Sequence, residues 1–349
     1  MEEEKKIQTK DKAIIAVLLL LLAVGVGIAI VFANRGGKEN PEPKSKDLFG
    51  YFDTYANFTV YSGISDKEFV EVSAAVEERL DYYHRLFDIY HVYNGITNAK
   101  NLNDNAGEGA LEISRELFDF LVYSKEICEL TGGEVNIAMG AVLSIWHEYR
   151  EEGKAIPEMQ ALESAALHTD INSLVLNEEK LTAEIKDPQL SLDLGALAKG
   201  YAVERIASDI EKMGYTSFVL NVGGNLRAVG AKPDGAEWET GVKNPDPTAE
   251  NKYSYRFKLS DSSAVTSGNY ERYYTVGGVN YHHIIDKDTL MPAAHFASVT
   301  VVTKSSALAD ALSTALFNMT YEEGVYLLEG LEGVFVVWVA NDGSVTTYE

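Results

Sequence analysis

AKGYAVERIASDIEKMGYTSFVLNVGGN, from Ala198 to Asn225, contains one helix followed by one strand. Apolar residues recur at helical spacing from Ala198 to Met213, and Gly214 closes the helix. Ser217 to Val222 is a short apolar strand that ends in a Gly-Gly pair, which makes a tight turn or cradles a pyrophosphate. The segment therefore predicts a domain in which helices and strands are mixed.

The flanking sequence continues this mixture without a regular strand–helix–strand repeat, which favours an α+β fold over a doubly wound sheet. Ser65 and Glu68 have the spacing of a capping box and predict a helix that runs to Asp88. Further helices are expected at 114–130 and 308–319, and a loop at 91–107. Strands are expected at 52–61, 253–259, 273–276, 298–302 and 333–339.

The N-terminal region has a different composition. Residues 1–12 form a short charged tail, and residues 13–33 are 21 uninterrupted apolar residues. At ~1.5 Å per residue a helix of that length reaches roughly 31 Å, about the thickness of a bilayer core. We predict an uncleaved transmembrane anchor, with a cleaved signal peptide as the alternative. A linker at 34–47 follows, and one large catalytic domain is expected over 48–349.

Charge limits the partners of that domain. The chain has 53 acidic and 30 basic residues, a net charge of −23, all of it located after residue 33. Such a balance opposes loose binding to polyanions, so a nucleic-acid partner is not expected. The tail and the linker carry equal numbers of basic residues, so orientation rests on the short tail and the long following domain. We expect a single-pass protein of the cell membrane with an extracytoplasmic domain.

Two clusters on predicted helices carry residues suited to chemistry. In SLDLGALAKGYAVE, Ser191 to Glu204, glycines allow close backbone approach and Lys199 lies in the opening turns of a helix, which suits an anion. In SALADALSTALF, Ser306 to Phe317, Asp310 and Thr314 lie four residues apart on one apolar face. Their oxygens suit a hard cation such as Mg²⁺, although a hydrogen bond inside a core helix is the simpler interpretation.

A third cluster contains adjacent histidines. In YHHIID, Tyr281 to Asp286, His283 precedes a carboxylate by three residues. A histidine near a carboxylate is the minimum for proton transfer, and histidines at strand ends are also common surface residues.

Taken in order, these motifs resemble the ApbE-type FAD:protein FMN transferases. The resemblance rests on five stretches: TGGEVNIAMG (131–140), LDLGALAKGYAVE (192–204), LNVGGN (220–225), AVTSGNYER (264–272) followed by YHHIID (281–286), and ADALSTALF (309–317). It covers about Phe52 to Phe317. Phe52-Asp53-Thr54 stands where the family usually has Met-Gly-Thr, and Asn136 where it commonly has Asp.

The resemblance implies an enzyme that cleaves FAD at the pyrophosphate with Mg²⁺ and transfers FMN to a Thr or Ser hydroxyl of an acceptor flavoprotein, releasing AMP. Implied metal ligands are the Ala196 carbonyl, Asp310 and Thr314, assisted by Ser313. The implied FAD site contains Glu134, Val135, Asn136, Asp193, Lys199, His283 and Ile284. His283 and Asp286 become the acid–base candidates. Two alternatives share the motifs: an FAD pyrophosphatase that uses water as acceptor, and a non-catalytic FAD-binding protein.

Overall fold

The computed structural model describes residues 42–61 and 63–349, and this part of the chain forms one compact unit. The predicted tail at 1–12, the predicted anchor at 13–33 and most of the predicted linker lie outside the described residues. Among the described residues, no helix combines the length and the apolar character needed to cross a bilayer. Helices and antiparallel strands are mixed in this unit, which confirms the predicted α+β class.

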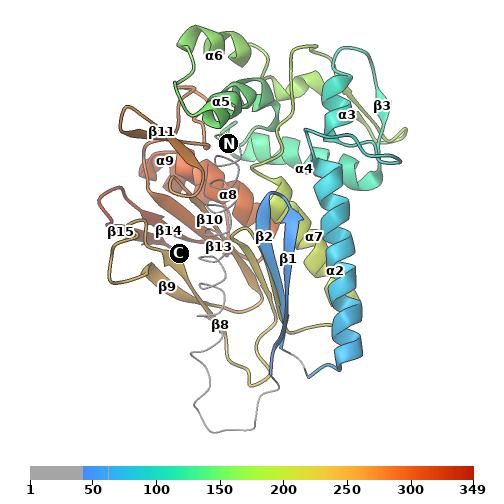
Figure 1. Ribbon diagram of the computed structural model, residues 1–349, viewed down its shortest axis with the longest axis vertical. Coiled ribbons are helices and arrows are strands. Elements are labelled where there is room, and N and C mark those ends of the chain that lie inside the picture. The colour runs from blue at the N-terminus through green and yellow to red at the C-terminus, as the bar shows by residue number, and fades with distance from the viewer. Residues whose placement is uncertain (1–41, 62) are drawn as a thin grey trace, which may run out of the picture. The chain divides into compact units, whose positions relative to one another are not determined.

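An eight-stranded antiparallel sheet lies at the centre of the unit (Figure 1). Its order is β1-β2-β6-β7-β10-β13-β14-β15. The strands are β1 (Lys44–Tyr51), β2 (Thr54–Val60), β6 (Phe218–Val222), β7 (Asn225–Val229), β10 (Ser262–Gly268), β13 (Ser298–Thr303), β14 (Phe335–Val339) and β15 (Val345–Tyr348).

Both faces of β14 are covered, which explains its unbroken apolar sequence FVVWV. Val336 and Trp338 pack in the cluster that contains the apolar side of α8 (Ser306–Asn318). Val337 and Val339 point the other way, toward aromatic residues of the ribbon β8 (Trp238–Lys243) and β9 (Tyr253–Leu259). The period-2 alternation of a strand thus places its side chains in two separate cores.

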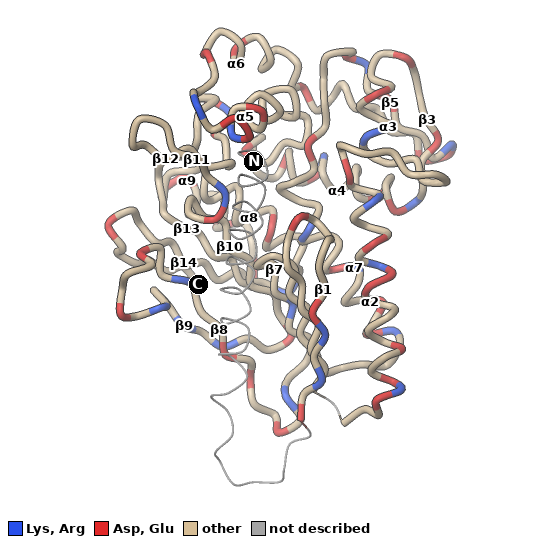
Figure 2. Tube along the Cα trace, in the orientation of Figure 1, with Lys and Arg blue, Asp and Glu red and all other residues tan. Residues whose placement is uncertain are grey.

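Three helices pack along the sheet and against one another (Figure 1). These are α2 (Asp66–Phe87), α7 (Ala198–Lys212) and α8. Acidic and basic positions are interspersed along α2 (Figure 2), and the predicted capping box of Ser65 and Glu68 begins this helix. A Cβ atom on Gly200 of α7 would lie 2.3 Å from the Cβ of Asp310, so the absence of a side chain there allows α7 and α8 to approach closely.

Residues 99–186 form a cap that continues past one end of the sheet (Figure 1). Its helices are α3 (Ala99–Asp104), α4 (Arg115–Leu130), η1 (Ile137–Met139), α5 (Gly140–Glu152), α6 (Met159–Ala166) and η2 (Ile171–Ser173), and its small sheet has the order β3 (Leu111–Glu112), β5 (Thr182–Ile185), β4 (Leu174–Asn177). The hairpin of β11 (Tyr273–Val276) and β12 (Val279–His282) and the helix α9 (Tyr321–Leu328) complete the unit.

Three predicted boundaries are wrong. Phe52 and Asp53 are not strand residues but the two-residue turn between β1 and β2, with φ angles of 52° and 51°. Such a turn needs positive φ at both central residues and usually contains Asn-Gly, so the aromatic and β-branched pattern concealed it. β1 begins inside the predicted linker, where Lys44 donates to Asp66 at the start of α2.

The third wrong boundary is the predicted loop at 91–107, which contains α3. Asn98 and Asn101 form a capping box with each other at its start, a role more often taken by Ser and Glu. Because asparagine is typical of turns, its density here indicated a loop.

Candidate active site

The buried carboxylate of Asp310 lies where α7 and α8 come closest. The amide of Gly200 donates to Asp310 Oδ2 at 2.7 Å. The side-chain nitrogen of Asn225, oriented toward the carboxylate, lies 3.2 and 3.3 Å from its two oxygens. Asp310 is 4% exposed, and burial raises the pKa of its carboxyl although Lys199 and these two donors oppose that rise. Within the described residues the carboxylate therefore receives neutral donors without a direct ion pair.

The Ala196 carbonyl is left without a hydrogen-bond partner by the same arrangement. In a regular helix the amide of Gly200 would donate to the carbonyl four residues earlier, which is that of Ala196. Here that amide donates to Asp310, and no other donor among the described residues takes its place. The amide that a regular helix would direct to Ala196 is therefore used by the buried carboxylate.

Three hydroxyl groups lie close together at the next turn of α8, on Ser267, Ser313 and Thr314. Asp310 and Thr314 are one turn apart on α8, as predicted. Ser267, at the end of β10, lies 2.9 Å from the Ser313 oxygen and 3.4 Å from the Thr314 oxygen. No three His, Cys, Asp or Glu side chains converge anywhere in the described part of the chain. A cation at Asp310 would therefore rely on one carboxylate and neutral oxygens, a donor set that suits Mg²⁺.

The two glycine-containing motifs at 131–140 and 191–199 are in contact. The amide of Asp193 donates to the Ile137 carbonyl at 2.8 Å, and a Cβ atom on Gly140 would lie 2.3 Å from the Ser191 carbonyl oxygen. The half-buried Asp193 accepts from the amide of Gly195 at 2.8 Å, and burial raises the pKa of its carboxyl. These contacts place Asp193 in the turn that precedes α7.

His283 lies near this turn, on the segment after β12. Its Nδ1 is 3.3 Å from the carbonyl oxygen of Arg272, an acceptor, so Nδ1 carries the proton and Nε2 is free to accept one. Burial and the positive charges of Arg272, Lys199 and Arg150 lower the pKa of His283 to about 3. His283 is therefore neutral at physiological pH.

The three cations around His283 do not donate to carboxylates among the described residues. Lys199 donates to the Gly195 carbonyl, Arg272 to the Asp53 carbonyl and Arg150 to the His147 ring. The charges of Lys199 and Arg150 also act on the Asp193 carboxyl, whose pKa they lower against the effect of burial, but neither side chain forms an ion pair with it. The exposed ring of Tyr90 lies 5.6 Å from that of His147 and extends the cluster to the surface.

His283 and Asp286, the two acid–base candidates, have separate hydrogen-bond partners. The Asp286 carboxylate accepts from the amides of Asp288 and Thr289, at 2.8 and 2.7 Å, and so stabilises the turn after it. The neighbouring His282 is buried and bonds the Ala293 carbonyl and the Ile284 amide, which makes it a core histidine.

Other predicted flavin-site residues are used within the protein. The Asn136 side chain caps η1 and donates to the Thr169 carbonyl. Val135 and Ile284 are buried in the core. Glu134 forms an ion pair with Lys287 at 3.2 Å, and its carbonyl accepts from Asn318. These contacts connect the motif at 131–140 to the segment after His283 and to the end of α8.

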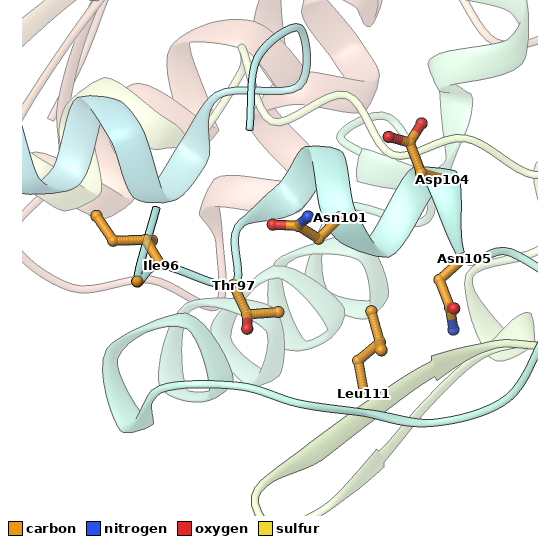
Figure 3. Close-up of a pocket in the computed structure, with 7 residues that line it drawn as sticks. Ile96, Thr97, Asn101, Asp104, Asn105 and Leu111 are labelled. Carbon is orange, nitrogen blue, oxygen red and sulfur yellow. The ribbon is translucent and has the colours of Figure 1, made fainter. Parts of the chain in front are cut away.

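A surface hollow lies elsewhere in the described part of the chain. Its volume is about 590 Å³, and its lining residues come from the α3 region and β3 (Figure 3). Asn101 and Asp104 of α3 and Leu111 of β3 are among them, and none of the predicted site residues contributes. The site is thus identified by convergent polar groups and not by the size of a cavity.

Asn225, Ser267, Arg272 and Arg150 were not predicted as site residues. The first three stand inside quoted motifs, LNVGGN and AVTSGNYER, so the signal was present without an assigned role. Arg150 stands in no motif, and only the packing of α5 brings it to the cluster.

Comparison with known proteins gives one consistent result. Residues 52–338 match the sequence profile of the ApbE family. A protein from Treponema pallidum named FAD:protein FMN transferase is 30% identical over 292 residues, which cover 80% of each chain. A protein of the same name from Haemophilus influenzae is 30% identical over 241 residues, covering 68% of this chain and 70% of that one. The crystal structure of the ApbE protein from Thermotoga maritima superposes with a TM-score of 0.77 at 26% identity, covering 88% of this chain and 97% of that one.

Proposed function

This chain belongs to the ApbE family, and from that premise we propose that it is an FAD:protein FMN transferase. FAD is its substrate, a Thr or Ser hydroxyl of an acceptor flavoprotein receives FMN, and AMP is released. The proposal rests on one observation: a group of oxygen atoms around Asp310, called here the corner at Asp310 (the Asp310 carboxylate, the Ala196 carbonyl and the Thr314 hydroxyl), occurs together with three cations around His283 that donate to no carboxylate. A pyrophosphate with its cation needs both.

The corner at Asp310 fits Mg²⁺. A buried carboxylate without a direct ion pair, and a carbonyl oxygen whose helical donor is diverted, are both groups that gain from a hard cation. Asp310, Thr314 and the Ala196 carbonyl would hold it. When bound there, Mg²⁺ would supply positive charge that offsets the negative charge of the pyrophosphate.

Lys199, Arg150 and Arg272 would bind the phosphate oxygens of FAD. Charge-assisted hydrogen bonds of this kind are about twice as strong as neutral ones. Because the same three charges depress the pKa of His283, an anion bound among them would raise that pKa again. His283 is thus a weak base in the free protein and a stronger one with the pyrophosphate in place.

His283 would take the proton of the acceptor hydroxyl at Nε2, since Nδ1–H is directed to the Arg272 carbonyl. The acceptor oxygen then bonds to the phosphorus of the FMN half, the bond from that phosphorus to the bridging oxygen breaks, and AMP leaves with that oxygen. Asp286, the second acid–base candidate, is given no role in this step, because its Oδ1 accepts from two turn amides and His283 bonds the Arg272 carbonyl instead.

We also propose that the chain is anchored in the cell membrane with its catalytic domain on the extracytoplasmic side. The support is the run of 21 apolar residues at 13–33. Full-length protein should remain in the membrane fraction after a carbonate wash. A soluble mature chain that begins at Asn34 would contradict the anchor.

The activity is tested with full-length protein in detergent, FAD, Mg²⁺ and a candidate acceptor domain. We expect fluorescent flavin on the denatured acceptor band, lost without Mg²⁺. Release of FMN and AMP without labelling would instead indicate a pyrophosphatase, and unchanged FAD would indicate a binding protein.

A further inference from the structure

A chain of hydroxyl groups connects Thr314 to the backbone of its own helix. The Thr314 oxygen lies 3.4 Å from that of Ser267, and the Ser267 oxygen lies 2.9 Å from that of Ser313. The Ser313 hydroxyl donates to the carbonyl oxygen of Asp310 at 3.0 Å. Ser313 is 0% exposed and Ser267 is 9% exposed, so water does not compete for most of the hydrogen bonds in this chain of hydroxyl groups.

The last acceptor fixes the direction of every proton. A carbonyl oxygen only accepts, and each hydroxyl has a single proton to give. Ser313 therefore uses its proton on the Asp310 carbonyl and accepts from Ser267. The Ser267 proton is then committed to Ser313, so Ser267 accepts from Thr314. In the longer contact of 3.4 Å, Thr314 is left with the donor role toward Ser267, and its lone pairs are available to another partner.

We propose that Ser267 is a positioning residue that presents the lone pairs of Thr314 to a divalent cation held by Asp310. This rests on the proposed Mg²⁺ site. A cation attracts the lone pairs of a hydroxyl and repels its proton, so a hydroxyl whose proton has a fixed acceptor elsewhere is a better ligand than one that rotates freely. The same geometry assigns Ser313 to the hydroxyl chain and not to the cation, because its proton and an accepting lone pair are both already used.

The strand that carries Ser267 also supplies a matched control. Thr266, the preceding residue of β10, is exposed, and its hydroxyl lies 2.8 Å from that of Thr300 on β13. Thr266→Ala removes a hydroxyl-to-hydroxyl bond from the same strand on the opposite face. A loss of Mg²⁺ affinity caused only by weakening of β10 would appear in both Thr266→Ala and Ser267→Ala.

The test measures Mg²⁺ binding to full-length protein without FAD, by isothermal titration calorimetry. Loss of a group that orients a metal ligand typically weakens metal binding 10–100-fold, so we expect a rise of ~10-fold or more in Kd for Ser267→Ala. Ser313→Ala breaks the chain one step further from the cation and should give a smaller rise. Thr266→Ala should leave Kd unchanged.

A double-mutant cycle separates positioning from packing. Once Thr314→Val has removed the ligand, Ser267→Ala should cost no further Mg²⁺ affinity. An equal loss in both backgrounds, or wild-type affinity in a folded Ser267→Ala protein, would overturn the proposal. Flavin transfer is measured separately, so wild-type protein that transfers FMN while Ser267→Ala binds Mg²⁺ normally would refute this inference alone.

Discussion

Replacing Asp310 with Asn should abolish the response to Mg²⁺ while keeping the fold. The substitution preserves the shape of the side chain and leaves an oxygen to accept from the Gly200 amide, which lies 2.7 Å from Oδ2. The new amide nitrogen meets Asn225, whose own amide can turn its oxygen toward it. The hydrogen bond from Gly200 is kept, and the main change is the loss of the charge.

The size of the effect follows from the burial of this charge. Without a cation, the carboxylate at 4% exposure carries a desolvation cost that Asn does not, so the variant should be as stable as wild type or slightly more stable. With Mg²⁺ at 100 times its Kd, wild type gains about 2.7 kcal/mol from binding, and the variant gains nothing. At about 2 °C per kcal/mol for a domain of this size, the wild-type melting temperature should rise by ~5 °C.

The assay is a thermal melt of both full-length proteins over a Mg²⁺ titration, together with flavin transfer at each concentration. Ca²⁺ and high NaCl serve as controls for ionic strength. An Asp310→Asn protein that is folded and keeps a wild-type Mg²⁺ shift would refute the metal site. It would show that Asp310 is only a buried member of a core helix.

Three further outcomes are expected. In ¹⁵N NMR spectra the His283 ring should stay neutral from pH 8 to pH 5, because its pKa is about 3, and added pyrophosphate should raise that pKa. Protonation of the ring near pH 6.5 in the free protein would refute the cationic cluster. Arg150→Gln should weaken FAD binding about tenfold in equilibrium dialysis, because it removes a charged hydrogen bond of ~1.5 kcal/mol or more. Lys154→Gln, at an exposed position, should leave FAD binding unchanged. Equal losses of affinity in both variants would indicate a general charge effect. Gly200→Ala should destabilise the fold by ~1–3 kcal/mol in urea titrations, because its Cβ would lie 2.3 Å from that of Asp310. The control Gly330→Ala, whose Cβ would meet nothing within 4 Å, should be nearly neutral. Similar losses of stability for both variants would contradict the close approach of the two helices.

Local sequence signals predict a helix correctly where capping residues mark its ends. Ser65 and Glu68 fixed the start of α2, and the helix predicted to close at Gly214 is α7. The short turn at Phe52 and Asp53 was not predictable in this way. It places two non-glycine residues at positive φ, and Arg272, 219 residues away in the sequence, donates to its Asp53 carbonyl.

The site shows the same division between local and distant information. The pairing of Asp310 with Thr314 on one helix face follows from helical spacing alone. The role of Gly200 could not be predicted from helical spacing. The glycines of this motif indicated close approach to a ligand, whereas the atoms nearest Gly200 belong to Asp310. Asn225 and Ser267 act through contacts 85 and 46 residues away, which no local pattern encodes.

A transferase differs from a hydrolase in that the bond broken in FAD is replaced by one to a protein hydroxyl. The most direct measurement is the intact mass of the acceptor domain alongside the AMP released in the same reaction. We predict one FMN added per AMP released, with both products lost in Asp310→Asn. AMP formed in excess while the acceptor mass stays unchanged would contradict the claim.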